Sequence, residues 1–240
     1  MYLTVEESIA LAKEAAKQEF PTETMTVALF PTALAFAQVR YFCASSPIKL
    51  GAQNCGWTPR GAYTGAISAE LFAEAGAVFA LVGHSERRHI FGETDSDVRK
   101  KIEACLAADL VPVVCVGETK EEKENSKREY RLKKQLMKAF EGLELNGKKI
   151  MVAYEPVWAI SANTRGETCL PADADDVAGW IRQELRQYGL ESIPLLYGGS
   201  VDANNVSAYL TDGGMDGVLV GSASTSAPSL IAMIDAVKKL

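Results

Sequence analysis

Short apolar runs rich in β-branched residues alternate with longer amphipathic stretches along nearly the whole chain. This alternation is typical of repeated strand–helix units built on a parallel sheet. A helix comes first, because Thr4 and Glu7 form a capping box and apolar residues then recur on one helical face. Seven strands are expected after it, at residues 26–30, 48–54, 77–83, 111–116, 149–155, 193–197 and 217–220. No linker or change of composition divides the pattern, which predicts a single domain over residues 1–240.

Helices are expected to separate these strands and to close the chain. Their predicted positions are residues 32–41, 68–74, 95–108, 121–141, 173–188, 203–210 and 228–239. The stretch 121–141 is predicted to be one long helix with Leu132, Leu136 and Phe140 on its inner face. The charges at 120–134 mix both signs at helical spacing, which favours a solvated helix face over a binding surface.

Composition excludes several classes of function. A formal net charge of −6 and a pI near 5.1 argue against a nucleic-acid or anionic-membrane partner. The five cysteines are widely spaced and lack metal-ligand spacing, so we expect no metal and a compartment in which thiols stay reduced, the cytoplasm. No apolar run approaches the ~18 residues of a membrane span, and no signal-peptide layout begins the chain.

Two side chains at predicted strand ends are candidates for chemistry. His84 ends one strand and starts a helix, whose positive end favours a neutral imidazole that can polarise a carbonyl. Glu155 ends a very apolar strand and is placed to act as a base. Read from its position alone, a histidine such as His84 is more often a structural residue than a catalytic one, and Glu155 is equally compatible with a surface carboxylate or the partner of an arginine.

Two glycine-bearing turns follow the last two predicted strands. They are Tyr197-Gly198-Gly199-Ser200 and the run from Val220 to Ser224. In parallel barrels these late loops often hold a phosphate group on backbone N–H groups. Gly-Gly is common in turns, so either loop alone is a weak sign of a phosphate site. The indication comes from the presence of both loops, one after each of the last two predicted strands.

A series of short motifs resembles the triosephosphate isomerase family, in the same order from the first helix to the C-terminus. The motifs are Gly51-Ala-Gln-Asn54, Tyr63-Thr-Gly65, Gly83-His-Ser-Glu-Arg-Arg88, Cys115-Val-Gly-Glu118, Tyr154-Glu-Pro-Val-Trp-Ala-Ile160, Tyr197-Gly-Gly-Ser-Val201 and Asp216-Gly-Val-Leu-Val-Gly221. The resemblance implies a (β/α)₈ barrel that interconverts dihydroxyacetone phosphate and glyceraldehyde 3-phosphate without a cofactor. By resemblance, Glu155 would move the proton between C1 and C2, His84 would polarise the carbonyl, and Glu86 would support the site. This family is the standard illustration of a carboxylate base beside a neutral histidine, so these roles are inherited from it.

The resemblance also implies a lid that closes over the substrate and excludes water. Its residues would be Pro156, Val157, Trp158, Ala159, Ile160, Ala162, Asn163 and Gly166. Substrate phosphate would be bound by Ser161, Ser200, Gly221 and Ser222. Lid closing would involve Tyr197, Gly198 and Gly199.

The main departure from the family lies at the start of the chain. The family's first strand ends in Asn-x-Lys-Met, whereas only residues 1–3 precede the Thr4 cap here. We therefore expect a seven-stranded, incomplete barrel lacking strand 1. Loss of one preorganised electrostatic group such as that Lys costs a rate factor of ~10²–10³. Three explanations remain open: a longer working protein, an open barrel stabilised by association, and a relative that keeps the fold without useful catalysis.

Other departures concern the lid and the subunit contact. Ser161 and Asn163 replace lid glycines, which removes backbone freedom there. Ala66 replaces the Glu of the family's Thr-Gly-Glu, which orders a loop that docks on the partner subunit. A homo-oligomer, a dimer or larger, is still expected. The alternative function is a noncatalytic protein that binds a phosphometabolite or acts as a scaffold.

Overall fold

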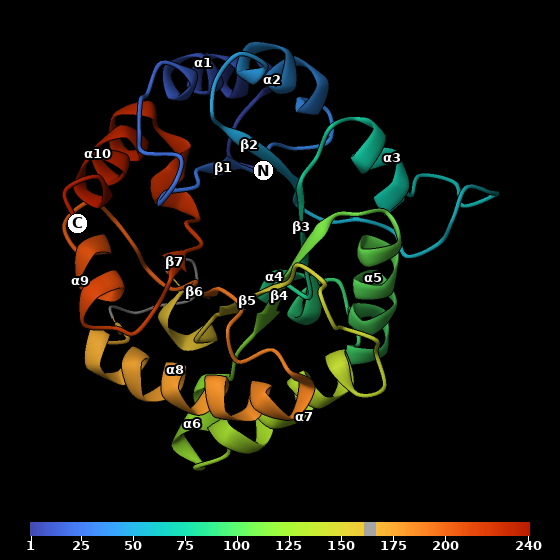
Figure 1. Ribbon diagram of the computed structural model, residues 1–240, viewed down its shortest axis with the longest axis vertical. Helices are drawn as coiled ribbons and strands as arrows, with labels where there is room; N and C mark the ends of the chain where they lie inside the picture. Colours follow the sequence, from blue (N-terminus) through green and yellow to red (C-terminus); the bar gives the residue numbers. More distant parts are fainter. Residues whose placement is uncertain (161–166) are drawn as a thin grey trace.

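Seven parallel strands form one curled sheet in the computed structural model, which describes residues 1–160 and 167–240. The strands are β1 (Ala28–Leu29), β2 (Lys49–Ala52), β3 (Phe79–Val82), β4 (Val111–Val116), β5 (Met151–Tyr154), β6 (Leu195–Tyr197) and β7 (Gly217–Val218). Each strand pairs in parallel with the next one in sequence, so the sheet curves around a common centre (Figure 1). The predicted α/β class and the seven strands are confirmed.

Most helices form a ring outside the strands, while the short helix α4 lies nearer the centre of the view beside β4 (Figure 1). The helices are α1 (Val5–Ala16), α2 (Phe36–Cys43), α3 (Ala69–Glu74), α4 (Ser85–His89), α5 (Asp95–Ala107), α6 (Lys120–Glu124), α7 (Arg128–Phe140), α8 (Pro171–Leu185), α9 (Val206–Thr211) and α10 (Ala227–Val237). Short 3₁₀ helices are η1 (Val157–Ala159), η2 (Arg186–Tyr188) and η3 (Ser222–Thr225). The predicted capping box is present, since Thr4 and Glu7 each bond the other's backbone N–H at the start of α1.

The two ends of the sheet differ from its middle. Within the described residues, β1 pairs only with β2, and β7 pairs only with β6. Both end strands are two residues long and half-buried, whereas β4 is six residues long and almost wholly buried. The helix ring is continuous over the two sheet ends, because α1 packs against α10 (Figure 1).

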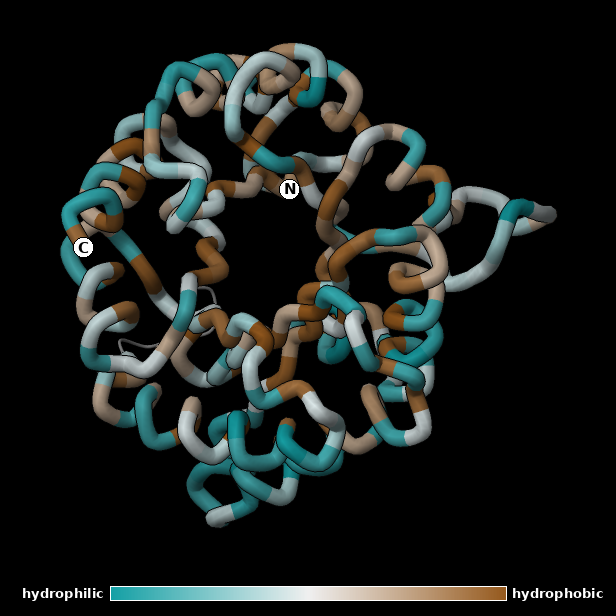
Figure 2. Tube along the Cα trace, in the orientation of Figure 1, coloured by the Kyte–Doolittle hydropathy of each residue, from teal (hydrophilic) through white to brown (hydrophobic). Residues whose placement is uncertain are grey.

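The apolar core lies in two layers. A large layer fills the space between the helices and the outer face of the sheet, and apolar residues line the strands and the inward faces of helices (Figure 2). A smaller layer inside the curve of the sheet is built on Phe79, Val113, Cys115 and Ala153. Strands buried on both faces explain the near-continuous apolar runs of the sequence.

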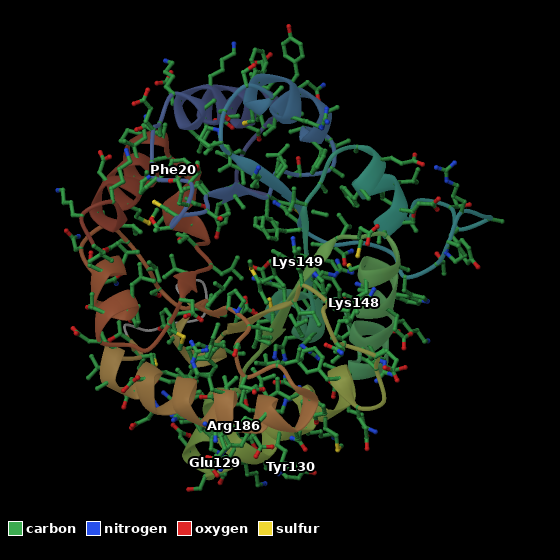
Figure 3. The ribbon with its side chains drawn as sticks, viewed as in Figure 1. Phe20, Glu129, Tyr130, Lys148, Lys149 and Arg186 are labelled. Carbon is green, nitrogen blue, oxygen red and sulfur yellow. The ribbon has the colours of Figure 1, made fainter. Side chains whose placement is uncertain are left out.

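The prediction of one long helix at 121–141 is wrong. The structure has two helices there, α6 and α7, because the chain turns at Ser126, whose φ of 55° is left-handed and not helical. The predicted inner face of α7 is confirmed, with Leu132, Leu136 and Phe140 buried. On its outer side Glu129 and Tyr130 point away from the strands (Figure 3) and are exposed, as a solvated helix face requires.

The described residues contain neither a membrane-spanning helix nor a cluster of metal-binding side chains. No helix there combines the length and hydrophobicity that a membrane crossing requires. Nor do three or more His, Cys, Asp or Glu side chains of residues 1–160 and 167–240 gather in a way that would hold a metal ion. All five cysteines are free thiols and all are buried.

Candidate active site

His84 is positioned by a sharp turn at the end of β3. Gly83 adopts a φ of 72°, which a residue with a Cβ rarely adopts, and this turn leads directly into α4. His84 is the N-cap residue of α4, and its Nδ1 accepts a hydrogen bond from the Glu86 N–H at 3.4 Å. In a neutral ring the proton therefore resides on Nε2, the nitrogen that faces away from the helix.

Glu155 follows β5 and is 2% exposed. Its Oε1 lies 3.0 Å from His84 Nε2, and its Oε2 accepts a hydrogen bond from the Ser85 N–H at 2.9 Å. The prediction that these side chains meet at the carboxyl ends of their strands agrees with this geometry. β4 separates β3 from β5 in the sheet, and the chain after β4 passes close to Glu155 at Gly117.

The carboxylate changes the expected charge state of the imidazole. Burial lowers the pKa of His84, but the hydrogen bond and the negative charge of Glu155, aided by Glu86, raise it above its ordinary value of 6.5. In this arrangement the carboxylate thus outweighs the helix terminus that favours a neutral ring. The hydrogen bond and the nearer negative charge both belong to Glu155. Movement of the Glu155 carboxylate away from His84 would therefore remove most of the rise in the pKa of His84.

Glu86 and the two late loops occupy the same end of the sheet. The Glu86 side chain is 58% exposed and its Oε2 is 3.9 Å from His84 Nδ1, so Glu86 holds the imidazole through its backbone. Ser200 follows β6, while Gly221 and Ser222 follow β7 and are exposed at the start of η3. Parallel strands β6 and β7 are neighbours, which puts both loops at the edge that carries His84 and Glu155.

Comparison with known proteins decides the family. A family model described as triosephosphate isomerase matches residues 1–237. The chain belongs to the triosephosphate isomerase family. The triosephosphate isomerases of Alkaliphilus metalliredigens and of a Nostoc species are each 38% identical to it in an alignment 240 residues long, which covers 98% of this chain and 95% of theirs. That of Dictyoglomus thermophilum is 38% identical over 229 residues, 93% of this chain and 91% of its own length.

The described residues of the predicted lid, Pro156 to Ile160, begin in a hydrogen-bonded cluster around Glu118. Glu118 is fully buried, and its Oε1 accepts from Trp158 Nε1 at 2.8 Å, Tyr154 Oη at 3.1 Å and Arg128 Nε at 3.2 Å. Lys123 Nζ lies 3.2 Å from the centre of the Trp158 ring, a cation–π contact. Pro156, η1 with Val157 and Ala159, and Ile160 are thereby anchored to the chain just after β4, to α6 and to α7.

The YGGS motif of the triosephosphate isomerase family contacts this same segment. Ser200 donates both its N–H, at 3.1 Å, and its Oγ–H, at 2.9 Å, to the Ala159 carbonyl. Gly198 donates its N–H to the Tyr154 carbonyl at 2.8 Å, with Gly199 next in the chain. The Tyr197 ring stacks on Tyr209 at 4.0 Å, and its buried hydroxyl has no hydrogen-bond partner among the described residues.

Several predicted lid and phosphate residues lie outside the described residues. They are Ser161, Ala162, Asn163 and Gly166. Conversely, the cluster at the start of the predicted lid contains three residues that have no role among the sequence predictions, Glu118, Arg128 and Lys123. A signal for Glu118 was present, because it follows a buried strand at the same sheet edge as Glu155.

Proposed function

We propose that this chain is a triosephosphate isomerase that interconverts dihydroxyacetone phosphate and glyceraldehyde 3-phosphate, acting as a single domain. The observation that carries the proposal is the 3.0 Å approach of His84 Nε2 to Glu155 Oε1 at the carboxyl ends of β3 and β5. A carboxylate and an imidazole N–H facing each other are the base and the electrophile that proton transfer next to a carbonyl requires. The family match and the relatives' names support the same activity.

The reaction uses contacts that the two residues already make. A triose carbonyl placed between them accepts the Nε2–H of His84, which stabilises negative charge on the oxygen as the enediolate forms. Glu155 then exchanges its bonds to His84 and the Ser85 N–H for the substrate, removes the proton from C1 and returns it at C2. His84 gives its Nε2 proton to the carbonyl oxygen on C2 and takes up the hydroxyl proton of the oxygen on C1, so that the two oxygens exchange roles. The cavity that Glu155 lines together with Ser85 and Gly117 measures about 10 Å³, which is room for about one water molecule and not for a triose phosphate.

Substrate phosphate is proposed to bind at the loops after β6 and β7. Gly221 and Ser222 are exposed there, and η3 presents its first N–H groups at that end. Ser200 is engaged with Ala159, so its N–H must leave that carbonyl to meet an anion. Phosphoglycolate, which resembles the enediolate, is expected to raise the melting temperature. An unchanged melting temperature at saturating phosphoglycolate would count against the phosphate site.

The seven strands are proposed to correspond to the second to eighth strands of the family's barrel. The supporting observation is that β1 and β7 each have one paired neighbour among the described residues. Residues 1–240 contain no Asn-x-Lys ahead of α1, and that Lys would face the substrate in the family. A version extended by a strand ending in Asn-x-Lys is therefore expected to be more active by ~10²–10³.

A homodimer and a cytoplasmic location are also proposed. Residues 56–67 project from the molecule as an arm between β2 and α3 (Figure 1), and Trp57, Tyr63 and Ile67 on it are exposed. Apolar side chains on a projecting segment are suited to contact a second copy. Five free thiols agree with a reducing compartment. Light scattering on the purified protein tests the dimer: a monomer at all concentrations would refute it.

The activity is tested by coupled isomerase assays on the extended and unextended chains. Glu155→Gln is expected to lower kcat by ~10²–10⁴, the usual contribution of a general base. Glu23→Gln serves as the matched control, because Glu23 is an exposed carboxylate in the loop between α1 and β1. If both chains are inert while phosphoglycolate still raises their melting temperature, the noncatalytic binding function replaces the isomerase proposal.

A further inference from the structure

Two buried thiols lie against each other outside the proposed active site. Cys55 Sγ and Cys105 Sγ are 3.6 Å apart, and the two residues are 1% and 0% exposed. Cys55 lies just after β2 at the base of the arm, and Cys105 lies in the last turn of α5. A disulfide has an S–S length of about 2.05 Å, so the sulfurs need to approach by roughly 1.6 Å.

The chain segments that carry the two thiols are already joined beside them. Lys101, one helical turn before Cys105, donates to Asn54 Oδ1 at 2.7 Å and to Glu93 Oε2 at 2.5 Å. Asn54 is the residue before Cys55. These buried contacts keep the end of β2 facing α5. Formation of the disulfide therefore requires movement only of the two cysteine side chains and of the backbone next to them.

One thiol of the pair is favoured as the nucleophile. The hydrogen bond with Cys105 lowers the pKa of Cys55 and the positive charge of Lys101 adds to this effect, while burial opposes it. Sharing that hydrogen bond and burial raise the pKa of Cys105. Since the thiolate is the reactive form, Cys55 reacts first.

We propose that Cys55 and Cys105 form a reversible disulfide when the protein meets a two-electron thiol oxidant. With a diazenedicarboxamide, the Cys55 thiolate adds to one nitrogen of the N=N bond and the other nitrogen takes a proton. Cys105 sulfur then attacks Cys55 Sγ, the S–N bond breaks, and the departing nitrogen takes the second proton. One S–S bond forms, two S–H bonds are lost, and the diazene is reduced to a hydrazine.

Access to the sulfurs comes from the arm. Residues 59–67 are all exposed, and few buried contacts hold that stretch, so it is a region of low local stability. Oxidation is therefore expected to be slow in buffer and faster in urea at concentrations below the unfolding transition. The linked protein is expected to unfold at a higher urea concentration, because the bond closes a loop between residues 50 positions apart in the unfolded chain.

The test treats the reduced protein with diazenedicarboxamide, with and without sub-transition urea. We expect the denatured protein to titrate three thiols in place of five, its mass to fall by two hydrogen atoms, and a peptide map to join Cys55 to Cys105. Dithiothreitol restores all five. Cys55→Ser and Cys105→Ser are expected to abolish the link, and Cys43→Ser, a buried cysteine elsewhere, retains it.

The wild-type peptide map decides the outcome even where a variant fails to fold. Five thiols persisting in urea just below the transition would overturn the proposal. A link between any other pair, or between two chains, would also overturn it. These readouts are independent of isomerase activity, so they stand or fall separately from the proposed function.

Discussion

Replacing Glu118 with leucine tests whether the hydrogen-bonded cluster around Glu118, at the start of the predicted lid, stabilises the fold. The carboxylate is completely buried and accepts hydrogen bonds from Tyr154, Trp158 and Arg128 through one oxygen. Leucine fills a similar volume but accepts none of them. The substitution therefore keeps the packing while it removes the acceptor, together with the buried charge and the Oε2 atom that has no partner among the described residues.

The magnitude follows from which donors can reach water. Tyr154 is 0% exposed and Trp158 is 5% exposed, so each keeps an unsatisfied donor at a cost of ~1–3 kcal/mol. The Arg128 side chain is 27% exposed and recovers hydration, so it adds little. We expect a loss of ~2–6 kcal/mol from the free energy of unfolding, a large share of the ~5–15 kcal/mol typical of a domain.

Urea unfolding monitored by circular dichroism and tryptophan fluorescence measures this loss. Glu124→Leu is the matched control, because that side chain is 64% exposed and its carboxylate lies 3.9 Å from Lys120 Nζ, a pair worth ~0–1 kcal/mol. Trp158→Phe should cost less in the Glu118→Leu background than alone, since its donor is already unpaired there. Equal stability of Glu118→Leu and Glu124→Leu, or additive costs in the double variant, would refute the reasoning.

Three further predictions concern the site and its supports. The raised pKa of His84 contributes stability that is fully present below about pH 6.5 and is lost as pH rises through the folded-state value, so urea midpoints of wild type should fall with pH more than those of His84→Gln. Gly117→Ala places a Cβ 1.8 Å from the Glu155 carbonyl oxygen and should cost ~1–3 kcal/mol in unfolding experiments while lowering kcat. Gly179→Ala, in α8 with no atom within 4 Å of the added Cβ, should raise stability by ~0.5–1 kcal/mol; a loss would contradict the helix assignment.

The order of the elements could be predicted from the sequence because each rests on local signals. The capping box at Thr4 and the apolar runs of the strands are such signals, and both match the structure. The break between α6 and α7 was missed because no glycine or proline marks it. Ser126 takes the left-handed conformation instead, a choice that residue-type preferences do not indicate.

The candidate site was likewise predicted only where local sequence signals indicate it. Strand ends and family motifs pointed to His84 and Glu155, and the structure brings them within 3.0 Å. The cluster at Glu118 could not be predicted, because its donors come from β5, η1 and α7, elements that meet only when the sheet curls. Likewise, the effect of Glu155 on the pKa of His84 depends on a distance between residues 71 positions apart in the chain, which no local pattern encodes.

The sheet supports the two halves of the proposed site unequally. β3 and β5 carry His84 and Glu155 and each pairs on both sides, with β4 between them as the longest and most buried strand. The loops proposed for phosphate follow β6 and β7, and β7 is a two-residue end strand with one neighbour among the described residues. End strands open at lower free energy than central ones. We therefore expect loosening of the sheet end to weaken the proposed phosphate binding, and raise KM, before it disturbs the His84–Glu155 pair.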